Sequence, residues 1–277
     1  MTVLIHTDKG EETVLTIRQY VRAESLEEAY TLAQKRNNIV LGGMAWLKMQ
    51  NRAVGTAIDL CALGLDTIEE TETEFRIGAM VPLRALEGHE GLNVLSHGAV
   101  AESLKGIVGV QFRNTATVGG SVWARFGFSD VTTILMALEA KVELYKAGVM
   151  TMEEFAALPR QQRDILVRVI VPKVPCKMYY LSQRNTKTDI PVLTCAAVER
   201  RGRVFAVVGA RPRPAAVYEG GGLFDGGVTE ESARAFGGRV AAQAAFGSNC
   251  RAGKDYRSKV AAVLVRRAVL ALREQEG

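Results

Sequence analysis

Two pairs of adjacent glycines, each directly after a short apolar stretch, place the strongest constraint on how this chain can fold. The first pair is Gly42–Gly43 in IVLGGMAWL, and the second is Gly119–Gly120 in RNTATVGGSVWARFGFSD. Glycine admits positive φ and has no Cβ, so each pair predicts a tight turn that ends a strand. Successive backbone N–H groups in such a turn can point into one concavity and bind an anion.

The two turns together can hold a diphosphate from two sides, with Thr117 and Ser121 adding hydroxyl donors beside the second pair. The alternative is that each pair forms a tight turn without a ligand. Other phosphate motifs are absent, because the sequence contains neither GxxxxGK[ST] nor GxGxxG. The sequence therefore indicates neither a P-loop nor a classical dinucleotide-binding fold.

Asp130 follows the second glycine pair by ten residues. A carboxylate next to a diphosphate would be repelled, so in such a site Asp130 is expected further out, accepting from sugar or ribityl hydroxyls. Spacing alone favours another reading, in which Ser129 or Asp130 caps the helix that follows.

Composition and charge exclude several classes of function. The 277 residues are 48% hydrophobic and 23% charged, which is ordinary for a globular protein. No apolar run approaches the ~20 residues of a membrane span, and the N-terminus lacks the basic start of a signal peptide, so a cytoplasmic location is expected. The net charge of +5 is spread along the chain without aromatic residues between clustered bases, which argues against nucleic-acid binding.

The cysteines and histidines indicate no metal site. Cys61, Cys176, Cys195 and Cys250 have spacings that suit neither zinc nor an iron–sulfur cluster, and the histidines form no HExxH pattern. We expect the cysteines to be buried free thiols.

The pattern of strands and helices predicts an α+β fold. Hairpins are expected for Val3–Ile5 with Val14–Ile17 and for Ile68–Glu70 with Phe75–Val81. A capping box of Ser25 and Glu28 starts a helix that should end near Asn37. Further strands are expected in 39–41, 53–59, 115–118, 141–145, 164–173 and 177–185, a third hairpin in 191–212, and further helices in 97–108, 131–140, 150–158, 229–245 and 256–276. The character of the sequence changes after Pro175, and we place a domain boundary near residue 172. The last helix is expected to pack on a sheet rather than on a membrane surface.

In this order the motifs resemble the FAD-binding, medium subunit of molybdenum hydroxylases, the xanthine dehydrogenase and carbon monoxide dehydrogenase family. The family pattern is close to RN-x-AT-(V/I)-GGN, then P-x-(S/A)-D, and the likeness spans about 18–277. It implies a two-subdomain FAD-binding (PCMH-type) fold in 1–172, with subdomains of about 1–55 and 56–172, followed by a smaller α/β C-terminal domain in 173–277.

The resemblance also implies which residues bind FAD. Asp130 would accept from a sugar-type hydroxyl, and no residue is implied to be catalytic. The diphosphate and the flavin side would be held by Ile39, Val40, Leu41, Gly42, Gly43, Met44, Ala45, Trp46, Thr117, Gly119, Gly120 and Ser121. The chain departs from the family at Met44–Ala45, where Thr-Asp is common, at Ser121, where Asn is common, and at Gly127, where Pro is common.

The implied function is electron transfer within a complex. A large partner would carry molybdopterin, a small partner [2Fe–2S] centres, and FAD in this chain would pass electrons to NAD or another acceptor. Two alternatives stay open: a stand-alone flavin oxidoreductase, and a degenerate assembly subunit that no longer binds flavin. Neither molybdenum nor an iron–sulfur cluster has ligands in this sequence.

Overall fold

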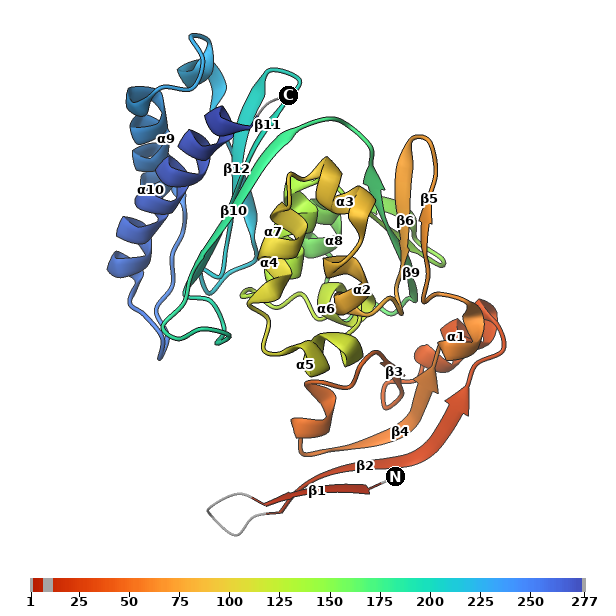
Figure 1. Ribbon diagram of the computed structural model, residues 1–277. Helices are drawn as coiled ribbons and strands as arrows, with labels where there is room; N and C mark the ends of the chain where they lie inside the picture. Colours follow the sequence, from red (N-terminus) through yellow and green to blue (C-terminus); the bar gives the residue numbers. More distant parts are fainter. Residues whose placement is uncertain (1, 7–11, 276–277) are drawn as a thin grey trace.

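The computed structural model describes residues 2–6 and 12–275, which are arranged around three β-sheets (Figure 1). The first sheet has the order β1-β2-β4-β3, in which β1 and β2 are antiparallel and β2, β4 and β3 are parallel. Its elements are β1 (Thr2–His6), β2 (Glu12–Arg22), α1 (Leu26–Ala33), β3 (Ile39–Leu41), the 3₁₀ turn η1 (Leu47–Met49) and β4 (Arg52–Asp59). The predicted N-terminal hairpin is confirmed, although its turn lies outside the described residues.

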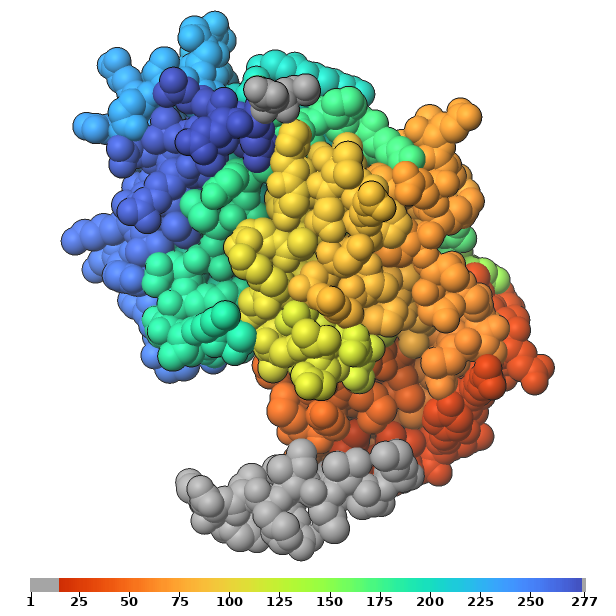
Figure 2. Space-filling view, viewed as in Figure 1, coloured from red at the N-terminus to blue at the C-terminus, as the bar shows by residue number. Residues whose placement is uncertain are grey.

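The second sheet is antiparallel, has the order β5-β6-β9-β7-β8, and is covered by short helices. Its strands are β5 (Ile68–Glu70), β6 (Glu74–Gly78), β7 (Lys141–Leu144), β8 (Gly148–Thr151) and β9 (Leu166–Pro172). The turn η2 (Cys61–Leu63) leads into it, and the helices are α2 (Leu83–Glu87), α3 (Glu90–Leu95), α4 (Ala99–Lys105), α5 (Val110–Thr115), α6 (Val118–Trp123), α7 (Asp130–Ala137) and α8 (Met152–Ala157). Figure 2 shows this middle unit, coloured orange to yellow-green, lying directly against the N-terminal sheet in red.

The third sheet is antiparallel, with the order β10-β11-β12-β13, and helices cover both of its faces. Its elements are β10 (Lys177–Gln183), β11 (Leu193–Arg200), β12 (Arg203–Gly209), β13 (Ala216–Glu219), η3 (Gly221–Phe224), α9 (Glu230–Gln243), α10 (Lys254–Ala271) and η4 (Leu272–Glu274). Alternate residues of β11 lie on opposite faces of the sheet. Cys195 and Ala197 pack against α9 and α10, whereas Ala196 and Val198 join the core around α7. Because this sheet is buried on both faces, the sequences of β11 and β12 are apolar at most positions instead of alternating.

Three expectations about elements need correction. Thr115–Val118 does not form a strand, because Thr117 caps helix α6 and the glycine pair lies in its first turn. Helix α1 ends at Ala33 rather than near Asn37. At its end, the Asn38 amide donates to the carbonyl of Leu32 and the Arg163 guanidinium donates to the carbonyl of Ala33. Ser25 caps α1 as predicted, but the Glu28 carboxylate binds the N–H of Glu24 instead of that of Ser25.

The terminal helix α10 packs with α9 on the third sheet, as expected. None of the helices in the described residues has both the length and the hydropathy needed to cross a membrane. The predicted boundary at 172 coincides with the end of β9, and the division into domains stays a prediction.

The expectation of four buried thiols is half wrong, because Cys176 and Cys195 are buried whereas Cys61 and Cys250 are exposed. Burial raises the pKa of the Cys195 thiol to about 12, which removes its reactive thiolate at neutral pH. We expect Ellman's reagent to label two thiols in the native protein and the other two only after unfolding. Cys250→Ser should abolish one native label and Cys176→Ser none; native labelling of all four would contradict the buried positions.

Candidate functional site

A cavity of about 550 Å³ lies where the N-terminal sheet meets the helices of the middle unit and a loop of the C-terminal sheet. This volume is typical of cofactor sites. Every residue that the sequence assigned to cofactor binding lines it: Ile39, Val40, Leu41, Gly42, Gly43, Met44, Ala45, Trp46, Thr117, Gly119, Gly120, Ser121 and Asp130. The structure thus brings both glycine pairs and Asp130 to one place, while their role toward FAD stays a prediction.

The first glycine pair begins a loop with free backbone donors. Strand β3 ends at Leu41, and Met44 takes a left-handed conformation with φ of 55°. Within the described part of the chain, none of the N–H groups of residues 42–47 donates to a protein acceptor. Backbone N–H groups normally find partners when they are buried, so a run of free donors beside a cavity suits an anionic ligand.

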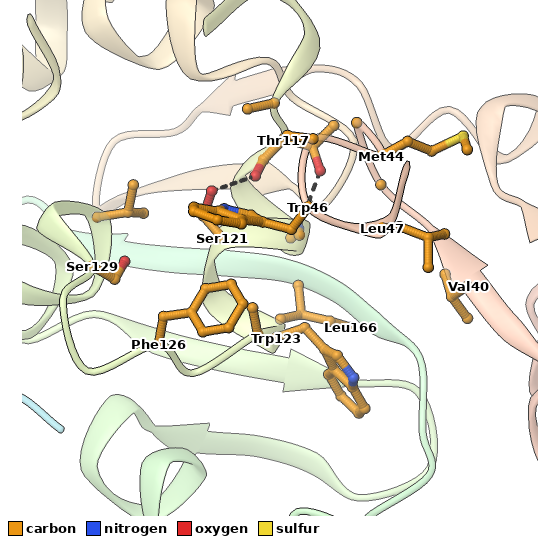
Figure 3. Close-up of a pocket in the computed structure, with 18 of the residues that line it drawn as sticks. Val40, Met44, Trp46, Leu47, Thr117, Ser121, Trp123, Phe126, Ser129 and Leu166 are labelled. Atoms are coloured by element: carbon orange, nitrogen blue, oxygen red, sulfur yellow. Dashed lines mark hydrogen bonds between the residues drawn. The ribbon is translucent and has the colours of Figure 1, made fainter. Parts of the chain in front are cut away.

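The second glycine pair does not supply the free N–H groups that the sequence suggested. The N–H of Val118 donates to Val81 O at 2.9 Å, and that of Gly119 to Ala79 O at 2.7 Å. The N–H of Gly120 donates to the Thr117 hydroxyl at 3.1 Å. The Ser121 hydroxyl donates to the carbonyl of Thr117 at 2.9 Å, one of the contacts drawn in Figure 3. The start of α6 is therefore a satisfied wall of the cavity.

The glycines instead allow the two segments to touch. A Cβ at position 43 would lie 1.9 Å from the carbonyl oxygen of Thr115, and one at position 119 would lie 2.6 Å from Ala79 O. A Cβ at position 42 would lie 2.8 Å from the Thr117 hydroxyl oxygen. Real Cβ atoms do not approach backbone oxygen so closely, so positions 43 and 119 require glycine. The contact fixes the first loop against α6 at the edge of the cavity.

Asp130 is the first residue of α7, and its side chain is 4% exposed. The preceding residue, Ser129, is the helix cap and accepts from the N–H of Thr132 at 3.1 Å. One carboxylate oxygen of Asp130, Oδ1, accepts from the Tyr180 hydroxyl and from the Arg184 guanidinium, both at 2.6 Å. Burial raises the pKa of the Asp130 carboxyl, with Arg184 acting in the opposite direction. This leaves Oδ2 as the atom that a ligand hydroxyl can approach.

Sequence reasoning missed three kinds of residue at the cavity. Phe126 and Phe128 line it together with Trp46, and the alternating RFGF pattern was their only signal. Arg184 lies in none of the motifs of the sequence analysis, and its ion pair with Asp130 spans 54 positions of sequence. Four further arginines line the cavity, and no local sequence pattern marks them: Arg36, Arg52, Arg160 and Arg163.

These features fit FAD. The loop of residues 42–47 offers donors for a diphosphate, and the cavity wall beyond it is largely apolar (Figure 3). The ionisable side chains along the cavity comprise five arginines and three aspartates, which favours an anionic ligand. No cluster of three metal-binding side chains occurs among the residues that the structure describes.

Comparison with solved structures confirms the α+β fold. Carbon monoxide dehydrogenase from Hydrogenophaga pseudoflava, in a form lacking the Mo-pyranopterin moiety of its molybdenum cofactor, superposes with a TM-score of 0.81 at 22% identity, covering 92% of this chain and 97% of that one. Reconstituted CO dehydrogenase from Oligotropha carboxidovorans superposes with a TM-score of 0.82 at 21% identity, covering 94% of this chain and 99% of that one. Quinoline 2-oxidoreductase from Pseudomonas putida 86 superposes with a TM-score of 0.80 at 19% identity, covering 94% of this chain and 97% of that one.

Sequence comparison assigns the family. The uncharacterized protein YgfM of Escherichia coli K12 is 23% identical over 209 residues, which are 73% of this chain and 78% of that protein. The model of the FAD binding domain in molybdopterin dehydrogenase matches residues 15–174, more than half of the chain. The chain therefore belongs to the family of molybdopterin dehydrogenase subunits that carry this FAD-binding domain.

Proposed function

We propose that this chain is the FAD-binding electron-transfer subunit of a multi-subunit molybdopterin-dependent dehydrogenase. The observation that carries the proposal is the loop of residues 42–47, which lines a cavity of cofactor size and whose N–H groups donate to no acceptor in the described part of the chain. Bound FAD would supply the ability to accept and donate electrons singly or in pairs. The protein's own contribution is to bind, orient and shield that group.

Each part of the cavity has a role in this proposal. The loop of residues 42–47 donates to the diphosphate, and arginines that line the cavity, among them Arg160 and Arg163, offset its charge. Asp130 accepts a sugar-type hydroxyl at Oδ2, while Arg184 and Tyr180 hold its Oδ1 in place. Thr117, Gly119, Gly120 and Ser121 form a wall behind the diphosphate, because the N–H groups of both glycines and the Ser121 hydroxyl already donate within the protein.

The proposed partners are a large subunit with molybdopterin and a small subunit with [2Fe–2S] centres, and the proposed acceptor is NAD or another oxidant. Support comes from the family and from the carbon monoxide dehydrogenase and quinoline 2-oxidoreductase structures that share the fold. The described part of this chain offers no cluster of metal ligands, so substrate oxidation is assigned to the partners.

Purification of the tagged full chain from its native host tests the proposal. We expect flavin absorbance in the chain and two co-purifying subunits that contain molybdenum and iron. Flavin without partner chains would replace the proposal with a stand-alone oxidoreductase. Partner chains without flavin, even after incubation with excess FAD, would replace it with an assembly subunit.

A further inference from the structure

Three aromatic rings form a cluster on the wall of the cavity. Phe126 and Phe128 stack with their centroids 5.0 Å apart and an interplanar angle of 11°. Trp46 lies across both, with its centroid 5.7 Å from that of Phe126 and 5.8 Å from that of Phe128. All three rings line the cavity, and Figure 3 shows Trp46 beside Phe126, with Ser121 on the neighbouring turn.

The hydrophobic cores do not account for this cluster. None of its three rings belongs to a core formed by the described residues, whereas the chain's other tryptophan, Trp123, packs against the core residue Phe155. Trp46 is 41% exposed, which leaves much of its indole without a protein neighbour. A large apolar ring that lines a cavity gains stability when a planar ligand covers it.

We infer that the indole of Trp46, supported by Phe126 and Phe128, is the surface against which the isoalloxazine ring of FAD stacks. The inference rests on the proposed function, because it takes FAD as the ligand of this cavity. Trp46 belongs to the same loop, residues 42–47, that offers N–H groups to the diphosphate, and Phe128 lies two residues before the carboxylate proposed for the sugar chain. A ring attached to that sugar chain is therefore close to the cluster.

The composition of the cluster favours the isoalloxazine over the adenine of FAD. The planes of Phe126 and Phe128 lie at 65° and 55° to that of Trp46, so the exposed indole is the ring that a planar ligand can cover and the phenylalanines support it. The cluster carries no carboxylate or amide side chain that would read the hydrogen-bonding edge of adenine. Its role is to position the flavin and to exclude water from one of its faces.

Stacking on an indole has a spectroscopic consequence. An excited flavin takes one electron from an indole in contact with it, and the electron then returns to the indole, so the flavin does not fluoresce. Phenylalanine stacks in a similar way but is a much poorer electron donor. Trp46→Phe therefore separates stacking from quenching, and Trp46→Leu removes both.

Titration of the full-length apoprotein with FAD, followed by absorbance, gel filtration and flavin fluorescence, tests the inference. Wild-type protein should retain FAD with its fluorescence below that of free FAD. Trp46→Phe should keep the dissociation constant within about threefold while the fluorescence of bound FAD rises, and Trp46→Leu should raise the dissociation constant about tenfold. Phe128→Leu should also raise the dissociation constant for FAD, which keeps the test valid if a Trp46 variant does not fold.

Tyr256→Leu is the matched control, because Tyr256 is an aromatic residue that is 48% exposed on α10 and does not line the cavity. Retained FAD with the same fluorescence in wild type and Trp46→Phe would overturn the stacking assignment and leave the FAD-binding function standing. Failure of the wild type to retain FAD in the absorbance measurement would overturn both.

Discussion

Gly43→Ala is expected to abolish stable FAD binding, raising the dissociation constant by at least about 100-fold. The new Cβ would lie 1.9 Å from the carbonyl oxygen of Thr115, and no side-chain rotation can relieve an overlap with backbone. The loop of residues 42–47 must therefore move away from the end of α5. Two misplaced charge-assisted hydrogen bonds to a diphosphate, at about 1.5–3 kcal/mol each, account for a loss of this size. Isothermal titration of the apoprotein with FAD measures it.

Alanine substitutions at other glycines should weaken FAD binding less, in proportion to how closely the added Cβ approaches its neighbours. Gly120→Ala places its Cβ 3.1 Å from the Thr117 hydroxyl oxygen, a contact that a small shift can relieve, so its effect on FAD affinity should be the smaller one. Gly238→Ala is the control, because this exposed helical position has nothing within 4 Å of the added Cβ. Thermal unfolding of each apoprotein separates a loss of the site from a loss of the fold. FAD binding by Gly43→Ala at wild-type affinity would disprove the role of this loop.

The sequence predicted which residues come together at the cavity better than it predicted their local structure. Gly43 was correctly placed at a loop after a short strand, because Ile39–Leu41 is apolar, two of its three residues are β-branched, and the glycine pair follows directly. Thr115–Val118 was read as a strand on similar grounds and was wrong. Residues far away in the sequence decide that this segment begins a helix and not a strand, because the carbonyls of Ala79 and Val81 accept from the first N–H groups of α6.

Burial and long-range pairing explain most of what the sequence could not provide. The N-terminal hairpin, the helices α7 and α10 and the buried strands were predictable from local apolar patterns, which are near-continuous where an element is buried on more than one face. The ion pair between Asp130 and Arg184 joins the middle unit to the third sheet, and no periodic pattern links such positions. The close contact of Gly127 with the backbone of Arg213, where a Cβ would lie 2.8 Å from the carbonyl oxygen, also depends on the third sheet. It gives a physical reason for glycine at 127, where the family commonly has proline.

Arg184→Leu is expected to lower the free energy of unfolding by about 3–5 kcal/mol at neutral pH, because it leaves the Asp130 carboxylate buried without its counter-charge. Burial already raises the pKa of the Asp130 carboxyl above its ordinary value, and Arg184 is the largest opposing influence. The hydroxyl of Tyr180 would remain as a hydrogen-bond donor, but it carries no positive charge.

The loss should depend on pH in a definite direction. A carboxyl whose folded-state pKa is raised contributes stability that is present below its unfolded pKa, about 4, and is lost as pH rises through the folded value. Removal of Arg184 raises the folded pKa of Asp130 further. The difference between wild type and Arg184→Leu should therefore be largest at neutral pH and shrink as the pH falls toward about 4. Urea unfolding at a series of pH values measures it.

Two further variants decide whether the uncompensated carboxylate is the cause. Adding Asp130→Asn to Arg184→Leu should recover part of the lost stability at neutral pH and remove the pH dependence, because the amide keeps the Tyr180 hydrogen bond without a charge. Arg234→Leu removes an arginine that is 74% exposed and pairs with Glu230 on the surface of α9, and it should leave the transition unchanged. An equal loss for Arg184→Leu at acidic and neutral pH would assign its effect to packing instead, and Asp130 would then be held in the cavity wall by Tyr180 and the start of α7 alone.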